Sequence, residues 1–260
     1  MTTALITGAS SGIGETFARE LAAESYDLIL VARSQDKLDL LATELSGKYQ
    51  IKTTVITQDL TEPAAGQAVF DGVKAKDLTV DLLINNAGFG DYGAFCDRPL
   101  SKMMAMVQLN ISAVVELTGL FLPLMQARRG GAIINLSSIA GFQPIPYMSV
   151  YAATKAFVLS FSEALWSENK DLGVKILAVC PGPTESEFYN RADFPDSATG
   201  LNGMTMASSE KVVKESLKAL KKGQSNVVAG GFANQIIVNL PRLVPRDLLV
   251  DVVGKQFKKI

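Results

Sequence analysis

Histidine is absent from the 260-residue sequence. Its absence excludes a Ser-His-Asp triad, a histidine-ligated zinc site and an imidazole base, so acid–base chemistry has to come from Tyr, Lys, Cys or carboxylate groups. We expect no metal site. Cysteine is scarce: Cys96 and Cys180 stand in apolar contexts. This predicts two buried thiols in a reducing compartment.

A strong net charge is also lacking, since the formal charge is −1. No global basic field attracts nucleic acid, and we expect no nucleic-acid partner. The apolar run that begins near Thr3 leaves no room for the basic region and cleavage site of a signal peptide. No uninterrupted apolar stretch approaches the ~20 residues of a membrane-spanning helix. These features predict a cytoplasmic protein.

Short apolar runs of the β type alternate with segments of helical periodicity. The runs lie at 3–7, 27–32, 52–57, 81–85, 131–136, 174–180 and 225–230. The helical segments lie at 15–24, 36–47, 62–75, 100–126, 149–170 and 209–221. This alternation predicts an α/β fold, a Rossmann-type doubly wound parallel sheet of about seven strands with helices on both faces.

Two segments stand outside this alternation. Residues 184–207 are rich in Asn, Asp, Ser, Gly and Met, and we expect them to form a substrate loop. Residues 232–260 form an amphipathic C-terminal extension. No linker or repeat divides the chain, so a single domain over residues 1–260 is predicted.

The first strand-type run ends in a turn that is crowded with glycine, TGASSGIG. Its spacing is G-x-x-x-G-x-G. Glycines permit a tight turn, let the backbone meet a pyrophosphate and leave that anion at a helix N-terminus. A glycine-rich turn without a ligand is the alternative. The turn residues assigned to cofactor binding are Gly8, Ser10, Ser11, Gly12, Ile13 and Gly14.

The next run, DLILVAR, indicates which dinucleotide would bind. An NAD site usually ends this strand with a carboxylate that holds the ribose 2′-hydroxyl, whereas Ala32 and Arg33 stand here. A guanidinium binds a 2′-phosphate through charge-assisted hydrogen bonds, and Ser34 offers a hydroxyl donor. We therefore predict NADP(H). The alternative is an ordinary surface arginine.

Side chains suited to proton transfer lie between residues 110 and 155. Tyr151 and Lys155 are four residues apart in the helical stretch SVYAATKAF, so they share one helix face. Ser138 follows a strand-type run thirteen residues before Tyr151, and Asn110 lies inside a long helical segment. A phenol with a cation one helical turn away is a suitable proton device where histidine is missing.

Taken in their order, these motifs resemble the short-chain dehydrogenase/reductase family of the compact, single-domain kind. The matching motifs are TGASSGIG, Asp59–Leu60, NNAG at 85–88, Asn110, Ser138, YAATK and Pro181–Gly182.

The resemblance implies a role for each matching residue. Tyr151 is the general acid in carbonyl reduction, and Lys155 binds the nicotinamide ribose and lowers the tyrosine pKa. Ser138 polarises the substrate carbonyl, and Asn110 holds a water linked to Lys155; a mere helix-bending role for Asn110 is the alternative. The further cofactor residues implied are Asp59, Leu60, Asn86, Ala87, Gly88, Pro181, Gly182 and Thr184, with Ser186 as the alternative to Thr184.

Apolar and aromatic residues follow the strands where a substrate would bind. Those assigned to the substrate, together with Ser138, are Phe142, Ile145, Tyr147 and Phe188. They favour an NADPH-dependent reductase of a small apolar ketone or aldehyde. A 3-oxoacyl-thioester or hydroxysteroid reductase is the alternative in the same class, and an NADP(H)-binding sensor is the alternative outside it.

The helical segments at 100–126 and 149–170 carry more apolar residues than one sheet face needs. By the resemblance they form a helical interface, which predicts a homodimer or homotetramer, and a monomer with sheet-buried helices is the alternative. The basic, amphipathic tail could lie on a membrane. The commoner role of such a tail is to cover the substrate cleft or a subunit contact, which we favour.

Overall fold

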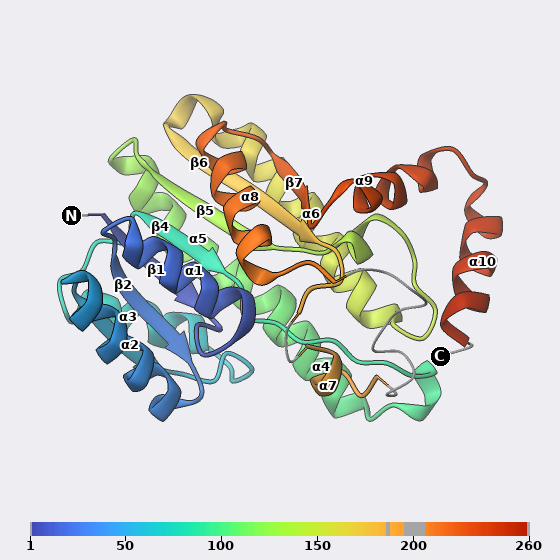
Figure 1. Ribbon diagram of the computed structural model, residues 1–260, viewed down its shortest axis with the longest axis horizontal. Coiled ribbons are helices and arrows are strands. Elements are labelled where there is room, and N and C mark those ends of the chain that lie inside the picture. Colours follow the sequence, from blue (N-terminus) through green and yellow to red (C-terminus); the bar gives the residue numbers. More distant parts are fainter. Residues whose placement is uncertain (1, 186–187, 195–205, 259–260) are drawn as a thin grey trace.

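The seven predicted β-type runs form one parallel sheet in the computed structural model, which describes residues 2–185, 188–194 and 206–258 (Figure 1). Each run is continuously apolar because both faces of the sheet are covered. The strands are β1 (Thr3–Thr7), β2 (Asp27–Ala32), β3 (Thr53–Thr57), β4 (Leu82–Asn85), β5 (Gly131–Leu136), β6 (Val174–Pro181) and β7 (Asn226–Ala229).

The strand order is β3-β2-β1-β4-β5-β6-β7, and every described pair of neighbours runs parallel. The chain winds outward from β1 to β3, then crosses over to β4 on the other side of β1. The strand order therefore reverses between β1 and β4, which is where a doubly wound sheet binds its ligands. The predicted fold class is confirmed.

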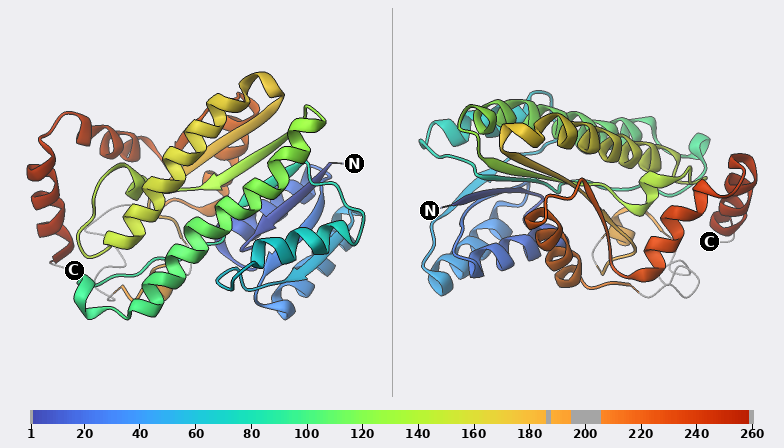
Figure 2. Two further views of the ribbon diagram at one scale, coloured as in Figure 1. Left: turned by 180° about the vertical axis from the view of Figure 1, so that it is seen from behind. Right: turned by 90° about the horizontal axis from the view of Figure 1, so that it is seen from above.

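Helices cover the two faces of the sheet as separate layers, seen edge-on in Figure 2. One layer holds α1 (Gly12–Ala23), α2 (Gln35–Tyr49) and α8 (Ser209–Lys221). The other holds α3 (Ala65–Lys74), α4 (Leu100–Val107), α5 (Ala113–Ala127) and α6 (Ser149–Asn169). The remaining helices are α7 (Phe188–Arg191), α9 (Phe232–Asn239) and α10 (Arg246–Lys258), with short helical turns at Phe95–Asp97, Ile139–Phe142, Lys170–Leu172 and Leu240–Arg242.

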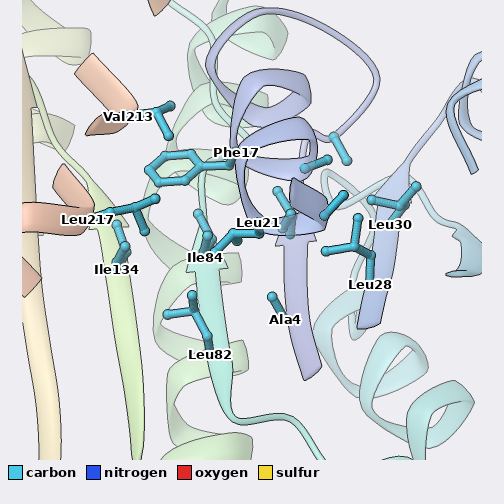
Figure 3. Packing of buried hydrophobic residues seen from close by; sticks show 14 of the residues in the cluster. Ala4, Phe17, Leu21, Leu28, Leu30, Leu82, Ile84, Ile134, Val213 and Leu217 are labelled. Atoms are coloured by element: carbon cyan, nitrogen blue, oxygen red, sulfur yellow. The ribbon is translucent and has the colours of Figure 1, made fainter. Parts of the chain in front are cut away.

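Successive strand residues point into opposite layers. Ile6 of β1 packs in the cluster that holds Phe17 of α1 and Val213 of α8, drawn in Figure 3. Its neighbour Leu5 packs in the other cluster, with Phe121 of α5. Two continuous apolar cores thus fix the sheet and hold its carboxyl edge in place.

The longest helical segment, Leu100–Ala127, is interrupted by a π-helical turn at Gln108–Ser112. By length and mean hydropathy (1.6) this helix is apolar enough to cross a membrane, although polar residues such as Lys102, Asn110 and Glu116 interrupt it, so the expectation of no uninterrupted apolar stretch of that length still holds. Its α5 part packs on the sheet through Leu117 and Phe121. The core helix of a soluble protein passes the same test, so the segment is no evidence of a membrane span.

The two cysteines differ in burial. Cys180, in β6, is fully buried, as predicted. Cys96 is exposed, so the prediction of two buried thiols is wrong for this residue. It lies in the turn Phe95–Asp97, where Phe95 is exposed as well, and the apolar neighbours in sequence do not form a core there.

The start of α1 is packed too closely for any side chain at Gly14. An added Cβ would lie 2.3 Å from the carbonyl oxygen of Gly8 and 2.4 Å from Nδ2 of Asn86. Gly47 in α2 is the matched control, because nothing lies within 4 Å of a Cβ there. Gly14→Ala is expected to lower the free energy of unfolding by about 1–3 kcal/mol through overpacking.

Gly47→Ala should instead raise the free energy of unfolding by up to about 1 kcal/mol, because alanine favours the helix. Urea unfolding of both variants measures this. Equal effects of the two substitutions would contradict the packing described for α1.

Candidate active site

A cavity of about 780 Å³ opens at the carboxyl edge of the sheet, beside the reversal of strand order between β1 and β4. Its wall combines the glycine turn after β1, the ends of β2, β4, β5 and β6, one face of α6, α7, and the tail helices. Its volume lies within the range of small-molecule sites.

The glycine turn lines one end of the cavity. Gly8 and Gly12 take the left-handed region, with φ of +66° and +57°, which only glycine adopts at little cost. Ser11 is the N-cap residue of α1 and makes no side-chain capping bond within the described chain. The start of α1 therefore faces the cavity as an anion-binding end.

The predicted turn residues divide into two groups. Gly8, Ser10, Ser11, Gly12 and Ile13 line the cavity. Gly14 is not among the lining residues; its close packing on Gly8 and Asn86 assigns it to the fit between α1 and the sheet.

Arg33 lies just after β2, at the rim of the same end. Its side chain is 67% exposed, and its Nη1 lies 3.6 Å from Oδ2 of Asp59. Although partial burial opposes it, hydrogen bonds from Thr61 and the charge of Arg33 lower the pKa of Asp59. The remaining residues predicted for this region, Ser34, Asp59, Leu60, Asn86, Ala87 and Gly88, all line the cavity.

Three predicted catalytic residues meet in the middle of the cavity. Ser138 follows β5 and caps the turn Ile139–Phe142, where its Oγ accepts from the amide of Ala140 at 3.1 Å. Tyr151 and Lys155 project from successive turns of α6, and all three residues line the cavity. The strand end and the helix face thus bring two hydroxyl groups and one ammonium group together.

Burial sets the ionisation of Tyr151, which is only 8% exposed. Burial raises the pKa of the phenol to about 12, partly offset by a hydrogen bond with Ser138. The net shift is upward, opposite to the lowering expected from Lys155, because loss of solvent outweighs the other effects on the pKa. The phenol therefore holds its proton at neutral pH, the state that a proton donor requires.

Lys155 is also buried, at 6% exposure, and burial lowers the pKa of its ammonium group to about 8. Its Nζ donates to the carbonyl oxygen of Leu136 at 2.8 Å and lies 5.7 Å from the centroid of the Tyr151 ring. At pH 7 this group remains mostly protonated, so it places a positive charge beside the phenol.

Asn110 lies behind the cavity wall, in the π-helical turn Gln108–Ser112. Its Nδ2 donates to the carbonyl oxygen of Phe89 at 3.0 Å and to Oγ1 of Thr154 at 3.1 Å. Its Oδ1 accepts from the amide of Phe89 at 3.2 Å. A Cβ at Gly88 would lie 3.0 Å from this Oδ1 and 3.4 Å from Nζ of Lys155, so the three residues adjoin. The π-helical turn thus places the amide against Phe89 and Thr154, next to Gly88 and not in the cavity wall.

The carboxyl end of β6 completes the cofactor side. Pro181, Gly182 and Thr184 line the cavity, and Oγ1 of Thr184 donates to the carbonyl oxygen of Gly182 at 2.9 Å. Ser186, the alternative to Thr184, lies outside the described residues. Of the predicted substrate loop, α7 and the bridge between Thr184 and Ala207 are described.

The substrate residues were predicted with mixed success. Ile145 and Phe188 line the cavity, as does Ser138. Phe142 and Tyr147 do not, and for these two the prediction is wrong. Phe142 packs against the cluster of Cys180 and its neighbours beneath the sheet edge.

Tyr147 is not in the cavity wall, and its backbone is in the left-handed region, with φ of +66°. Its ring lies 6.3 Å from that of Tyr92. The following residue, Met148, lines the cavity in its place. Composition cannot tell which face such a turn presents.

The tail forms a wall that the sequence-based assignment of substrate residues omitted. Its cavity-lining members are Ile237, Leu240, Leu249, Val252, Val253, Gln256 and Phe257. The helical spacing of 249, 253 and 257 was the available signal. Figure 1 shows α9 and α10 beyond the sheet, on the side of α6. This placement agrees with the favoured role of the tail as a cover of the cleft.

This chain is similar to known proteins in sequence and in fold. The family model described as short chain dehydrogenase matches residues 2–194. A very-long-chain 3-oxoacyl-CoA reductase of Bos taurus is 38% identical over 186 residues, which are 68% of this chain. The chain spans 58% of the length of that relative.

Two further proteins match more of the chain. The 17-beta-hydroxysteroid dehydrogenase type 3 of Mus musculus is 29% identical over 258 residues, covering 98% of this chain and 80% of the mouse protein. A solved short-chain dehydrogenase from Sphingobium yanoikuyae, in complex with NADPH, has a TM-score of 0.81 at 34% identity. That match covers 88% of this chain and 87% of the solved one. With the family model matching from Thr2 to Phe194, this chain belongs to the short-chain dehydrogenase family.

Proposed function

We propose that this chain reduces the ketone of a large apolar substrate, a 3-oxoacyl thioester, with NADPH as the cofactor. The observation that carries the proposal is the position of Ser138, Tyr151 and Lys155 in the wall of a cavity whose far side is apolar. The sequence favoured a small ketone or aldehyde. The apolar tail wall and the relatives support its alternative.

The donors and glycines at one end of the cavity fit a phosphorylated dinucleotide. The start of α1 and Ser11 suit its pyrophosphate, and the Arg33 guanidinium suits a 2′-phosphate. A carboxylate at the position of Ala32, which would hold a ribose 2′-hydroxyl, is missing. When bound, NADPH supplies a hydride. The solved relative from Sphingobium yanoikuyae, in complex with NADPH, supports this choice.

The protein contributes the proton and the stabilisation of charge. Tyr151, a phenol that is protonated at neutral pH and whose pKa burial raises further, donates its proton to the carbonyl oxygen. The Ser138 hydroxyl donates a hydrogen bond to the same oxygen as negative charge develops on it. The ammonium group of Lys155 stabilises the phenolate that remains. Asn110 is proposed to hold the water that returns a proton.

The far wall indicates the size and polarity of the substrate. Ile145, Met148 and Phe188 continue into the apolar side chains of the tail. Burying each methylene of a substrate is worth about 0.8 kcal/mol, so such a wall favours a long chain over a small ketone. The reductase of Bos taurus acts on very-long-chain 3-oxoacyl-CoA by its name, and we propose the same class here.

A steroid ketone is the second candidate. The 17-beta-hydroxysteroid dehydrogenase of Mus musculus covers 98% of this chain, including the tail that forms the apolar wall. A rigid fused-ring substrate and a flexible acyl chain both suit an apolar cavity, so the substrate panel below includes both. An NADP(H)-binding sensor is disfavoured because Asn110, Ser138, Tyr151 and Lys155 are all present.

The predicted homodimer or homotetramer also remains a proposal. Large apolar side chains are exposed on α4, α5 and α6, among them Met104, Val115, Leu124 and Phe157. A self-complementary contact between these helices would bury them.

Tyr151→Phe removes the proton donor and keeps the ring. We expect kcat/KM for reduction to fall about 10²- to 10⁴-fold, the contribution of a positioned general acid. The Kd of NADPH, measured by calorimetry, should stay within about twofold, because the ring and Lys155 remain. Tyr49→Phe on α2 is the control and should match the wild type. Retained turnover in Tyr151→Phe would contradict the proton-donor role.

Arg33→Ala is expected to raise the KM of NADPH about tenfold or more, because charge-assisted hydrogen bonds to the 2′-phosphate are lost. The KM of NADH should change less than about threefold. Arg19→Ala, which removes a guanidinium paired with Glu44 outside the cavity, is the control. Equal increases for both cofactors would show that Arg33 does not contact the 2′-phosphate.

A panel of 3-oxoacyl thioesters of increasing chain length, steroid ketones and small ketones tests the substrate class, followed by NADPH absorbance. We expect kcat/KM to rise about two- to fourfold per methylene until the cavity is filled, from the transfer energy of a buried CH₂. A preference for the small ketones would contradict the proposal, and a preference for steroids would favour the second candidate.

A further inference from the structure

A cluster of four charged side chains ties the segment just after α7 to the loop before α4 and to the first turn of α4. We call it the latch: Asp91, Arg98, Lys102 and Asp193. Three members come from residues 91–102, and Asp193 alone comes from the segment 188–194. The latch has no assigned role in the chemistry of the proposed reaction.

The cations bridge the two carboxylates. Arg98 contacts Asp91 through two hydrogen bonds, Nε to Oδ2 at 2.8 Å and Nη2 to Oδ1 at 2.5 Å. The same Nη2 reaches Oδ2 of Asp193 at 2.5 Å. Lys102 Nζ lies 2.7 Å from Oδ1 of Asp91 and 2.7 Å from Oδ2 of Asp193. The cluster is electrically balanced, with two charges of each sign.

The four side chains of the latch differ in burial, and the more buried ones are the fixed part of the cluster. The Asp91 side chain is 4% exposed, and those of Arg98 and Lys102 are 21% and 27% exposed. The Asp193 side chain is 54% exposed. Hydrogen bonds from Lys102 and Arg98 lower the pKa of Asp193, so it is ionised at neutral pH. Asp91, Arg98 and Lys102 thus form a site of net positive charge that holds the Asp193 carboxylate, which follows α7 in the chain.

Neutral contacts join the same two segments. The amide of Tyr92 donates to the carbonyl oxygen of Ala192 at 2.9 Å. The ring of Tyr92 lies 4.8 Å from that of Phe194. Phe188 packs over Gly90, where an added Cβ would lie 2.5 Å from Cζ of Phe188. Phe188 and residues 192–194 are therefore held against residues 90–102.

The segment that the latch holds also contacts one of the reacting groups, Tyr151. The Phe188 ring lies 5.2 Å from the ring of Tyr151, and both line the cavity. Lys102 lines the cavity as well, so the latch borders the substrate side. A loss of the latch would let Phe188 move away from Tyr151 and open the apolar wall there.

The backbone conformation of Asp193 supports the interpretation that its ion pairs hold the segment 188–194 in place. Its φ is +56°, the left-handed region that a non-glycine residue occupies at some cost, with Asp and Asn among the more tolerant types. Two cations hold the carboxylate at this residue. Asn retains this tolerance and nearly the same shape, so Asp193→Asn removes the charge with little change to the backbone preference.

We propose that Asp193 is a positioning residue, whose ion pairs with Arg98 and Lys102 hold Phe188 against Tyr151 and so determine how tightly the apolar substrate binds. The inference rests on the proposed function for its substrate and on the geometry above for its mechanism. Asp193 is the residue that holds the substrate wall at Phe188 in place, and the role of Tyr151 as the proton donor is unchanged.

The test compares Asp193→Asn with the wild type, using the best 3-oxoacyl thioester of the panel. We expect KM for the thioester to rise about three- to tenfold, with kcat changed less than twofold and the Kd of NADPH unchanged. Because salt screens a half-exposed pair, raising KCl should raise the wild-type KM towards that of the variant. Asp193→Glu keeps the charge and should recover part of the loss.

Hydrogen exchange over residues 188–194 gives a readout that needs no turnover. We expect faster exchange in Asp193→Asn and no change in Glu44→Gln, which breaks an exposed pair with Arg19 remote from the cavity. Unchanged KM and unchanged exchange would overturn the proposal. So would equal losses in kcat, KM and NADPH binding, since these would mean general unfolding of the site.

If the wild type reduces no carbonyl compound, the proposed function fails and exchange alone decides whether the latch holds the segment.

Discussion

The proton on the Tyr151 phenol is the feature on which the remaining site depends. The phenol is buried beside Ser138, and burial raises its pKa to about 12. The phenol is therefore protonated across the neutral pH range in the protein without substrate, which is the state that a proton donor has before it reacts. The sheet places Ser138 at the end of β5, and α6 places Tyr151 and Lys155 on successive turns. Each is oriented by elements whose positions the two apolar cores determine.

Much of the fold follows from patterns that are local in sequence. The runs at 3–7, 27–32 and 131–136 match strands at both ends, because continuous apolar segments bounded by turns fit a sheet buried on both faces. The first helix starts at Gly12, three residues before the predicted Glu15, since its opening residues belong to the glycine motif and carry little helical signal.

The catalytic part of the site was predictable because it depends on local features of the sequence. Tyr151, Lys155 and Ser138 meet as expected, because helix spacing and a strand end are local features. The direction of the Tyr151 pKa shift and the orientations of Phe142 and Tyr147 were not predictable. They depend on burial and on one left-handed turn, which arise only when distant segments pack together.

The substrate side is assembled from segments far apart in the chain. Residues 89–102, the segment 188–194 and α10 meet there, and Tyr92 joins them: its amide donates to the carbonyl oxygen of Ala192, and its hydroxyl donates to that of Phe257 at 2.6 Å. The loop 89–93 thus connects Gly88, at the cofactor side of the cavity, to the wall formed by the tail. Residues of both helices line the cavity, so changes there would reshape its wall while Tyr151 stays in place on α6.

The ionisation of Tyr151 in the protein without substrate is the most direct measurement. Carbon NMR of tyrosine labelled at Cζ, with Tyr151→Phe to assign the resonance, follows the phenol through a pH titration. We predict that this signal stays in the protonated form well above pH 10, in line with a pKa of about 12. Ionisation near neutral pH would contradict the claim that burial keeps the proton on Tyr151.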